Sequence, residues 1–402
     1  LGITYDRDVI RLLDVFRGFG LYVSSVVLTR YQDMPTVKAF QARLESMGVK
    51  VYHHYDIPGY PSDTAHIVSD EGFGRNEYIE TTRELVVVTA PGPGSGKLAT
   101  CLSQLYHEHL RGMQAGYAKF ETFPVWNLSI NHPVNLAYEA ATADLSDVNM
   151  IDPFHLDAYN VTTVNYNRDV EAFPVLVAMF EKLLGHCPYK SPTDMGVNMV
   201  GNCIVDDAET RKASSQEIIR RYYTAQCDFK QGKISEDVIR KLELLMKKAG
   251  VSPAGRSVVA PALERAELTG KPAAAMEMPD GTIITGKTSD LLGACSALLL
   301  NALKYLAGLE DELHLISPSV IDPIQHLKVD HFGNRNPRLH TDEILIALSI
   351  CAATDSRAEQ AMEQLDKLRG CDVHSSVILS AVDEKTFKRL GVHLTCQPRY
   401  KG

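Results

Sequence analysis

The spacing of apolar and polar residues over the first 125 positions predicts helices and strands in alternation. Apolar residues recur at helical spacing over 8–17 and 36–47, whereas 21–29 and 49–55 are rich in β-branched and aromatic residues. Residues 85–89 read Leu-Val-Val-Val-Thr, an uninterrupted run typical of a strand covered on both faces. Strands that alternate with helices pair in parallel, so we expect a doubly wound, mostly parallel α/β sheet.

The rest of the chain divides into two further parts by the same pattern. From His132 onward it is mostly helical, with helices expected over 133–145, 170–184, 214–231 and 235–249. Residues 251–287 are rich in Pro, Gly and Ala and mark a boundary near 250. Beyond it helices and short strands alternate again. We therefore predict an α/β domain over 1–165, a helical lobe over 166–250 and a second α/β domain over 251–402.

A glycine-rich turn, Gly92-Pro93-Gly94-Ser95-Gly96-Lys97, follows the apolar run and precedes a helix expected over 97–113. A turn of this kind at the end of a strand presents backbone N–H groups and a helix N terminus to an anion, and a lysine adds a mobile positive charge. We therefore expect phosphates of a nucleotide or phosphorylated metabolite to bind at Gly92, Gly94, Ser95, Gly96 and Lys97.

The turn matches the P-loop pattern G-x-x-x-x-G-K-[ST] only in part. Gly96 and Lys97 fit, but Pro91 replaces the leading glycine and Leu98 replaces the hydroxyl residue that would bind Mg²⁺. A Mg²⁺ ion would then need carboxylates elsewhere. Two candidates lie in an acidic stretch further along the chain, Asp147 and Asp152.

Two other interpretations of the turn remain open. Gly94 to Ala99 also reads as the dinucleotide fingerprint G-x-G-x-x-A, with Glu121 at the end of the next expected strand as the acid for the ribose. This interpretation would make NAD(P) the cofactor. The turn could also be a tightly packed structural feature without any ligand.

Four side chains outside the turn are candidates for chemistry. Lys119 and Glu121 end a strand expected over 117–123 and should face the same crevice as the turn. Asp152, in a non-helical segment, is a candidate general base or metal ligand. Arg168 is a candidate second phosphate clamp, because a guanidinium binds phosphate oxygens at two points. An ordinary solvated position is the alternative for each of them.

An irregular segment in the last third of the chain, residues 330–340, contains two His, two Arg and two Asn. Loops with this many donors commonly bind anions. A solvated loop is at least as plausible from the sequence alone.

Composition and charge narrow the class of protein. The net charge of -9 argues against a nucleic-acid binder. The longest apolar stretch, over 291–306, is too short and too polar to span a bilayer, so no membrane partner is expected. The eight scattered cysteines fit reduced thiols in a cytoplasmic protein. We expect a small phosphorylated ligand as the partner and leave a homo-oligomer open.

Several segments resemble one bacterial family, which is defined only as a domain of unknown function (DUF1846). They are Val88 to Ser103, Tyr117 to Asn127, and the stretches 131–152, 192–198 and 334–340, so the resemblance covers nearly the whole chain. Members of the family look longer at the N terminus, and the chain starts at Leu1 rather than Met, so we expect a further N-terminal segment. The resemblance implies no activity.

The residues themselves predict a cytoplasmic enzyme that uses ATP or GTP, with Mg²⁺, for phosphoryl transfer to a small metabolite or for its ligation. Lys97 would neutralise charge on the transferred group, and Lys119, Glu121 and Asp152 would act on the substrate. One alternative is an NAD(P)-dependent oxidoreductase. The other is a non-catalytic nucleotide or phosphometabolite sensor, which agrees with the missing hydroxyl at Leu98.

Overall fold

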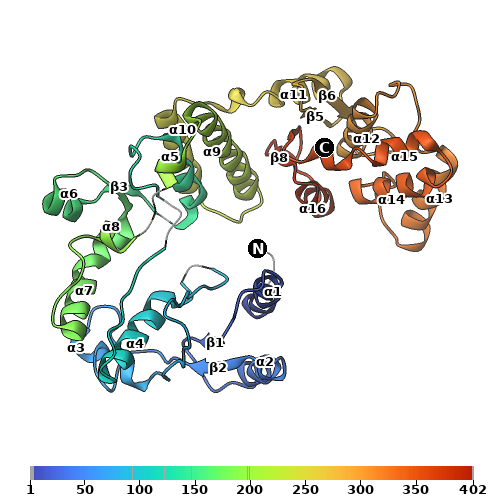
Figure 1. The fold of residues 1–402 in the computed structure, drawn as a ribbon. Coiled ribbons are helices and arrows are strands. Elements are labelled where there is room, and N and C mark those ends of the chain that lie inside the picture. The colour runs from blue at the N-terminus through green and yellow to red at the C-terminus, as the bar shows by residue number, and fades with distance from the viewer. Residues whose placement is uncertain are drawn as a thin grey trace. The chain divides into compact units, whose positions relative to one another are not determined.

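A computed structural model describes residues 4–92, 94–120, 124–145, 147–196, 198 and 200–400. The chain forms two compact units, the first from Leu1–Asn127 and Met150–Gly201 and the second from Leu128–Asn149 and Asn202–Gly402. Each contains helices and small sheets, so the protein belongs to the mixed α/β class that the sequence predicts (Figure 1). No helix in the described ranges has the length and apolar character needed to cross a membrane.

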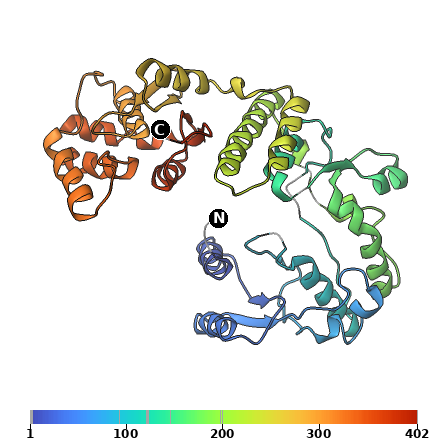
Figure 2. The ribbon, with the colours of Figure 1, turned by 180° about the vertical axis from the view of Figure 1, so that it is seen from behind.

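The first unit opens with a repeated helix and strand. Helix α1 (Tyr5–Gly18) leads to β1 (Ser25–Leu28), and α2 (Pro35–Ser46) leads to β2 (Lys50–His53). The two strands pair in parallel, with Ser25 opposite Lys50. Figure 2 shows α2 beside β2, and the buried side chains between helices and strands include Leu13 and Leu44. These four predicted elements are confirmed.

A larger core in the same unit joins α4 (Lys97–Leu110) to α7 (Asn167–Leu184). Leu102 of α4 and Phe173 and Phe180 of α7 are buried in it. Shorter elements surround this core or extend the chain around it: α3 (Thr64–Ile67), η1 (Phe73–Arg75), β3 (Asn149–Ile151), α6 (Pro153–Tyr159), β4 (Val164–Tyr166), α8 (Pro192–Met195) and η3 (Val200–Cys203). Strands β3 and β4 form a separate two-stranded sheet.

The doubly wound sheet does not form among the described residues. Residues 85–90 adopt no strand, and the side chains of Leu85 and Val87 are 82% and 77% exposed. The backbone of Lys119 forms an isolated parallel bridge to Gly196, and residues 121–123 lie outside the described ranges. An apolar run shows which side chains suit a strand, but a strand also needs hydrogen-bonding neighbours, which distant parts of the chain must supply.

The second unit begins with a group of helices. It contains α5 (Pro133–Ala141), η2 (Ala143–Leu145), α9 (Asp207–Lys230) and α10 (Glu236–Ala249). Leu136, Ile218, Leu242 and Leu245 form the buried core between them. The helices predicted over 133–145, 214–231 and 235–249 are therefore confirmed, with α5 ending earlier and α9 beginning earlier than expected.

A four-stranded sheet follows, in the order β6-β5-β7-β8. Its strands are β5 (Ala273–Glu277), β6 (Ile283–Lys287), β7 (Asp372–Ser375) and β8 (His393–Cys396). Strand β5 is antiparallel to both β6 and β7, and β7 is parallel to β8. Strands β6, β7 and β8 therefore run in one direction, and their carboxyl ends lie along the same edge.

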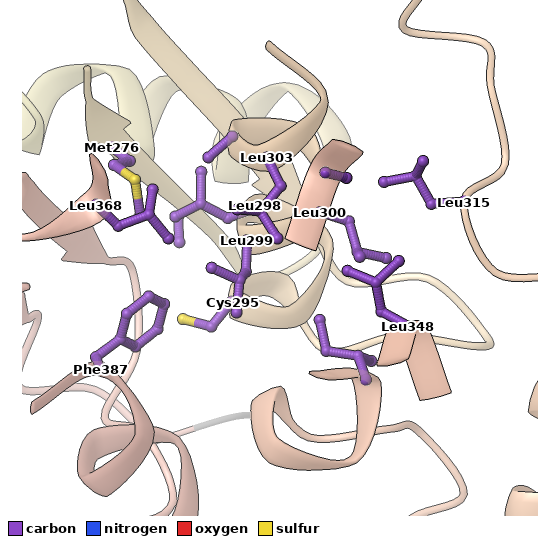
Figure 3. Close-up of a cluster of buried hydrophobic side chains, with 14 of the residues drawn as sticks. Met276, Cys295, Leu298, Leu299, Leu300, Leu303, Leu315, Leu348, Leu368 and Phe387 are labelled. Carbon is purple, nitrogen blue, oxygen red and sulfur yellow. The ribbon is translucent and has the colours of Figure 1, made fainter. Parts of the chain in front are cut away.

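Helices cover this sheet, and the large core lies between the sheet and several of them. They are η4 (Pro253–Gly255), α11 (Val259–Thr269), α12 (Ala294–Leu306), α13 (Pro318–His326), the π-helical turn η5 (Leu327–His331), α14 (Thr341–Ala352), α15 (Ser356–Met362), η6 (Leu365–Leu368) and α16 (Ala381–Arg389). Figure 3 shows Leu298 and Leu303 of α12 close to Met276 of β5, and Cys295 facing Phe387 of α16. A Cβ at Gly286 of β6 would lie 2.2 Å from the backbone nitrogen of Leu298, so only glycine permits this approach.

Candidate functional site

The glycine turn sits at the N terminus of α4, and two of its glycines require backbone angles that other residues rarely adopt. Gly94 has φ +69° and Gly96 has φ +84°, both in the left-handed region. Gly96 is the N-cap of α4, and no side chain of the described residues caps the helix. The first-turn N–H groups of this 14-residue helix thus lack the usual side-chain acceptor.

Hydrogen bonds fix the turn from inside and from a neighbouring strand end. The Ser95 hydroxyl donates to the Gly92 carbonyl at 2.8 Å, and the Lys97 Nζ donates to the same carbonyl at 3.0 Å. The hydroxyl of Thr29, which follows β1, donates to the Ser95 carbonyl at 3.1 Å. The turn therefore lies beside the carboxyl end of β1, the usual edge for ligands in α/β sheets, although residues 85–90 before it form no strand.

Lys119 and Arg168 lie around one aromatic ring. The Lys119 Nζ donates to the Tyr166 hydroxyl at 2.6 Å and also binds the Asp169 carboxylate. The guanidinium carbon of the exposed Arg168 is 5.6 Å from the centroid of the Tyr166 ring. The structure thus brings together two predicted cations at the start of α7. Glu121, which was predicted to lie beside Lys119 at a strand end, is outside the described residues.

Asp152 is completely buried and caps α6. One of its carboxylate oxygens accepts from the backbone N–H groups of Phe154 and His155, at 3.0 and 3.1 Å. The other accepts from the backbone N–H and the hydroxyl of Thr193. Since four donors of the fold already bind this carboxylate, its local geometry is that of a structural cap joining α6 to α8.

The predicted metal ligands fall into different units. Asp147 is buried in the second unit, where its backbone carbonyl accepts from the Lys241 Nζ at 2.5 Å, whereas Asp152 belongs to the first unit. Across the described ranges, no group of three or more His, Cys, Asp or Glu side chains has metal-binding geometry.

A second site lies at the start of α12, and the sequence indicated only part of it. A small pocket there is lined by Gly293 to Ser296, by Asn336, Arg338, Leu339 and His340, by Val377 and Leu379, and by Asp383. The loop residues belong to the donor-rich segment 330–340. Asp383 and the start of α12 were missed, because only the fold brings them to this loop. A glycine placed between a strand and an apolar helix, Gly293, was the available signal.

The chain matches two family models. Residues 1–250 match the N-terminal domain of DUF1846, and residues 254–402 match the C-terminal domain of DUF1846. Similar proteins include a UPF0371 protein of Corynebacterium diphtheriae, 61% identical, and one of Corynebacterium urealyticum, 60% identical. A UPF0371 protein of Streptococcus thermophilus is 57% identical. Each comparison covers the whole of this chain and 81% of the relative.

Proposed function

The chain belongs to the DUF1846 family, and we propose that it binds the phosphate groups of a nucleotide or a phosphorylated metabolite at the turn before α4. One observation carries the proposal. The turn combines two glycines with left-handed backbone angles, a helix N terminus without a side-chain cap, and a lysine whose Nζ donates to the carbonyl of Gly92.

Each part of this arrangement suits a phosphate. The N–H groups at the start of α4 are hydrogen-bond donors in a region of positive helix dipole. Among the described residues, the Lys97 ammonium is bound by the neutral oxygens of Gly92 and Ser95, so a phosphate oxygen would be a stronger partner than either. A phosphate would therefore draw Lys97 off the Gly92 carbonyl and into a charge-assisted contact.

The reaction that we propose at this site is phosphoryl transfer or ligation with ATP or GTP, in which Lys97 neutralises charge on the transferred group. Leu98 stands where a P-loop has its Mg²⁺-binding hydroxyl. A Mg²⁺ ion would thus be held mainly by the nucleotide and by residues outside the turn. The chain's role at the turn is to grip and orient the phosphates.

A sensor without catalysis is the second candidate, and the geometry of Asp152 favours it. Both carboxylate oxygens of this predicted base accept hydrogen bonds from donors of the fold. A carboxylate bound in this way already serves as a structural cap, so it offers no oxygen without a partner to a substrate. Binding of a nucleotide without turnover is the outcome that this candidate predicts.

Equilibrium binding of ATP, with and without Mg²⁺, tests the proposal. We expect Lys97→Ala to weaken binding by roughly tenfold or more, the loss expected for a charge-assisted hydrogen bond. Lys247→Ala, on the exposed face of α10, is the matched control and should bind like wild type. Equal affinity in Lys97→Ala, or no binding to wild type, contradicts the proposal.

Two further measurements separate the candidates. Tighter binding of NAD(P) than of ATP would favour the oxidoreductase that uses the fingerprint from Gly94 to Ala99. Release of phosphate or nucleoside diphosphate from bound ATP, absent in Lys97→Ala, would favour the transferase or ligase over the sensor.

A further inference from the structure

The pocket at the start of α12 lies where two strands of the same direction lead into helices. Strand β6 is followed by residues 288–293 and α12, and β7 is followed by residues 376–380 and α16. Antiparallel β5 lies between them. Ligands of α/β sheets bind at such carboxyl ends, where neighbouring connections diverge. The pocket has room for one water-sized group, about 10 Å³.

Donors converge on this pocket from separate segments. Helix α12 has 13 residues, and its N-cap, Gly293, has no side chain to cap the first turn. Asn336, Arg338 and His340 come from the loop before α14. Apolar Val377 and Leu379 line another side, which lowers the local polarity and strengthens electrostatic interactions inside.

Hydrogen bonds fix the positions of the two basic side chains of the pocket. The Arg338 Nε donates to the Ser289 carbonyl at 2.7 Å, and this leaves the two terminal nitrogens of the guanidinium for a ligand. The His340 Nδ1 lies 3.0 Å from Asp383 Oδ2. The other oxygen of Asp383 accepts from the backbone N–H and hydroxyl of Thr341. The imidazole is therefore held in one orientation with Nε2 unused by Asp383.

One cation of the pocket lining, Arg338, is not paired with a carboxylate of the described residues. Asp383 pairs with His340, and Glu343 pairs with the buried Lys328 at 2.6 Å. Within the described part of the chain, Arg338 has no carboxylate partner. A half-buried guanidinium beside apolar side chains is costly to leave without a counter-ion. Arg338 therefore carries a positive charge that an anion can neutralise.

We propose that this pocket binds the carboxylate group of a small organic acid. A guanidinium and a carboxylate match in planar two-point geometry, and the uncapped N terminus of α12 adds backbone donors. Because the pocket has room for only one water-sized group, one carboxylate oxygen would enter it and the rest of the acid would lie outside. The site is separate from the glycine turn of the other unit and stands independently of the function proposed there.

Amide spectra of the ¹⁵N-labelled, deuterated chain test this proposal, with acetate as the probe at constant ionic strength in chloride. The amide signals of Ala294 and Ser296 should shift with acetate and reach saturation. Arg338→Gln should weaken acetate binding at least tenfold, whereas Arg335→Gln, an exposed arginine of the same loop outside the pocket lining, should match wild type. Arg338→Lys keeps the positive charge but loses the two-point geometry of the guanidinium, so its acetate affinity should lie between those of Arg338→Gln and wild type.

Several outcomes overturn the proposal. They are shifts that rise linearly without saturation, equal affinities in Arg338→Gln and Arg335→Gln, and tighter saturation of the same amides by inorganic phosphate than by acetate. If Arg338→Gln fails to fold, Arg338→Lys and His340→Gln supply the comparison, and wild-type affinity in both of these variants would also overturn it. Lys97→Ala should leave acetate binding unchanged, so a failure at the glycine turn is distinguishable from a failure here.

Discussion

Arg256 and Asp372 form an ion pair inside the second unit, with 3.0 Å between Arg256 Nη1 and Asp372 Oδ1. The Arg256 side chain is completely buried, and burial lowers the pKa of its guanidinium while Asp372 acts in the opposite direction. Arg256 Nε also donates to the Thr395 hydroxyl at 3.0 Å. One side chain from the segment after η4 thus binds both β7 and β8.

Replacement of Arg256 should strongly destabilise the second unit. Arg256→Met leaves Asp372 without its closest cation, and a broken buried pair costs about 3 kcal/mol or more. Urea unfolding monitored by circular dichroism measures this change. Arg240→Met is the control, since Arg240 pairs with Glu236 at 3.2 Å on the surface and the loss should stay below about 1 kcal/mol. Equal losses in the two variants would contradict the interpretation of Arg256 as a buried connector.

The two left-handed glycines of the turn should differ in their tolerance of alanine. Gly94→Ala adds a methyl group to open space and should cost about 1 kcal/mol of unfolding free energy from the backbone alone. Gly96→Ala should cost about 2 kcal/mol or more, because its Cβ would also lie 3.1 Å from Thr29 Cγ2. Gly116→Ala, at an open position without positive φ, is the control and should change little. A smaller loss at Gly96 than at Gly94 would contradict this order.

Local pattern was sufficient to predict most helices and several strands. The elements α1, β1, α2 and β2 follow directly from apolar spacing, and α4 begins at the predicted residue, Lys97. Helix α12 begins at Ala294, three residues after the start of the apolar stretch over 291–306, because the Ser289 hydroxyl accepts from the N–H groups of Leu291 and Leu292 and holds a turn there. A side chain that competes for backbone groups is not visible in apolar spacing.

The pairing of strands that are distant along the chain could not be predicted from the sequence. The run from Leu85 to Val88 has strand composition, yet nothing local determines whether another strand lies beside it. The same limit applies to the sites. The glycine turn is a local motif and was found, whereas Asp383 meets His340 from 43 residues away through the packing of α14 against α16.

His374 should control part of the acid sensitivity of the second unit. It is completely buried, and burial, with the Arg256 charge as a second cause, lowers its pKa to about 3. In the unfolded chain this imidazole takes up a proton near pH 6.5, whereas in the folded chain it stays neutral down to about pH 3. The contribution of His374 to the free energy of unfolding is therefore complete above pH 6.5 and falls as the pH drops toward 3. The slope should approach about 1.4 kcal/mol per pH unit.

Urea midpoints between pH 6.5 and 4 test this prediction with His374→Gln, which cannot titrate. The variant should lose stability less steeply than wild type over this range, whatever its stability at pH 7. The titration of Asp383 does not affect this comparison. Its pKa is lowered to about 2, so its stabilising charge is lost only below the tested pH range. If the urea midpoints of the two proteins changed equally with pH, His374 would not be held neutral by the fold, and the prediction would be wrong.

The His340 and Asp383 pair should produce the opposite dependence at alkaline pH. The hydrogen bond to Asp383 is the largest cause that raises the pKa of His340, and burial opposes it. Other groups that act on this imidazole include the hydroxyl of Ser380, the N-cap of α16, and the charges of Lys328 in η5 and Glu343 in α14. A raised pKa means that the stabilisation is complete below pH 6.5 and is lost as the pH rises through the folded pKa of His340.

His340→Gln should therefore cost most at pH 6, by about 1.5–3 kcal/mol for a hydrogen bond between charged groups, and less at pH 9. Urea unfolding at the two pH values measures the difference, with the exposed His331→Gln of the same loop as the control. The same titration bears on the pocket, because acetate affinity should weaken over this range as the imidazolium beside Arg338 loses its proton. A cost of His340→Gln that is equal at both pH values would show that the imidazole acts through packing rather than through its charge.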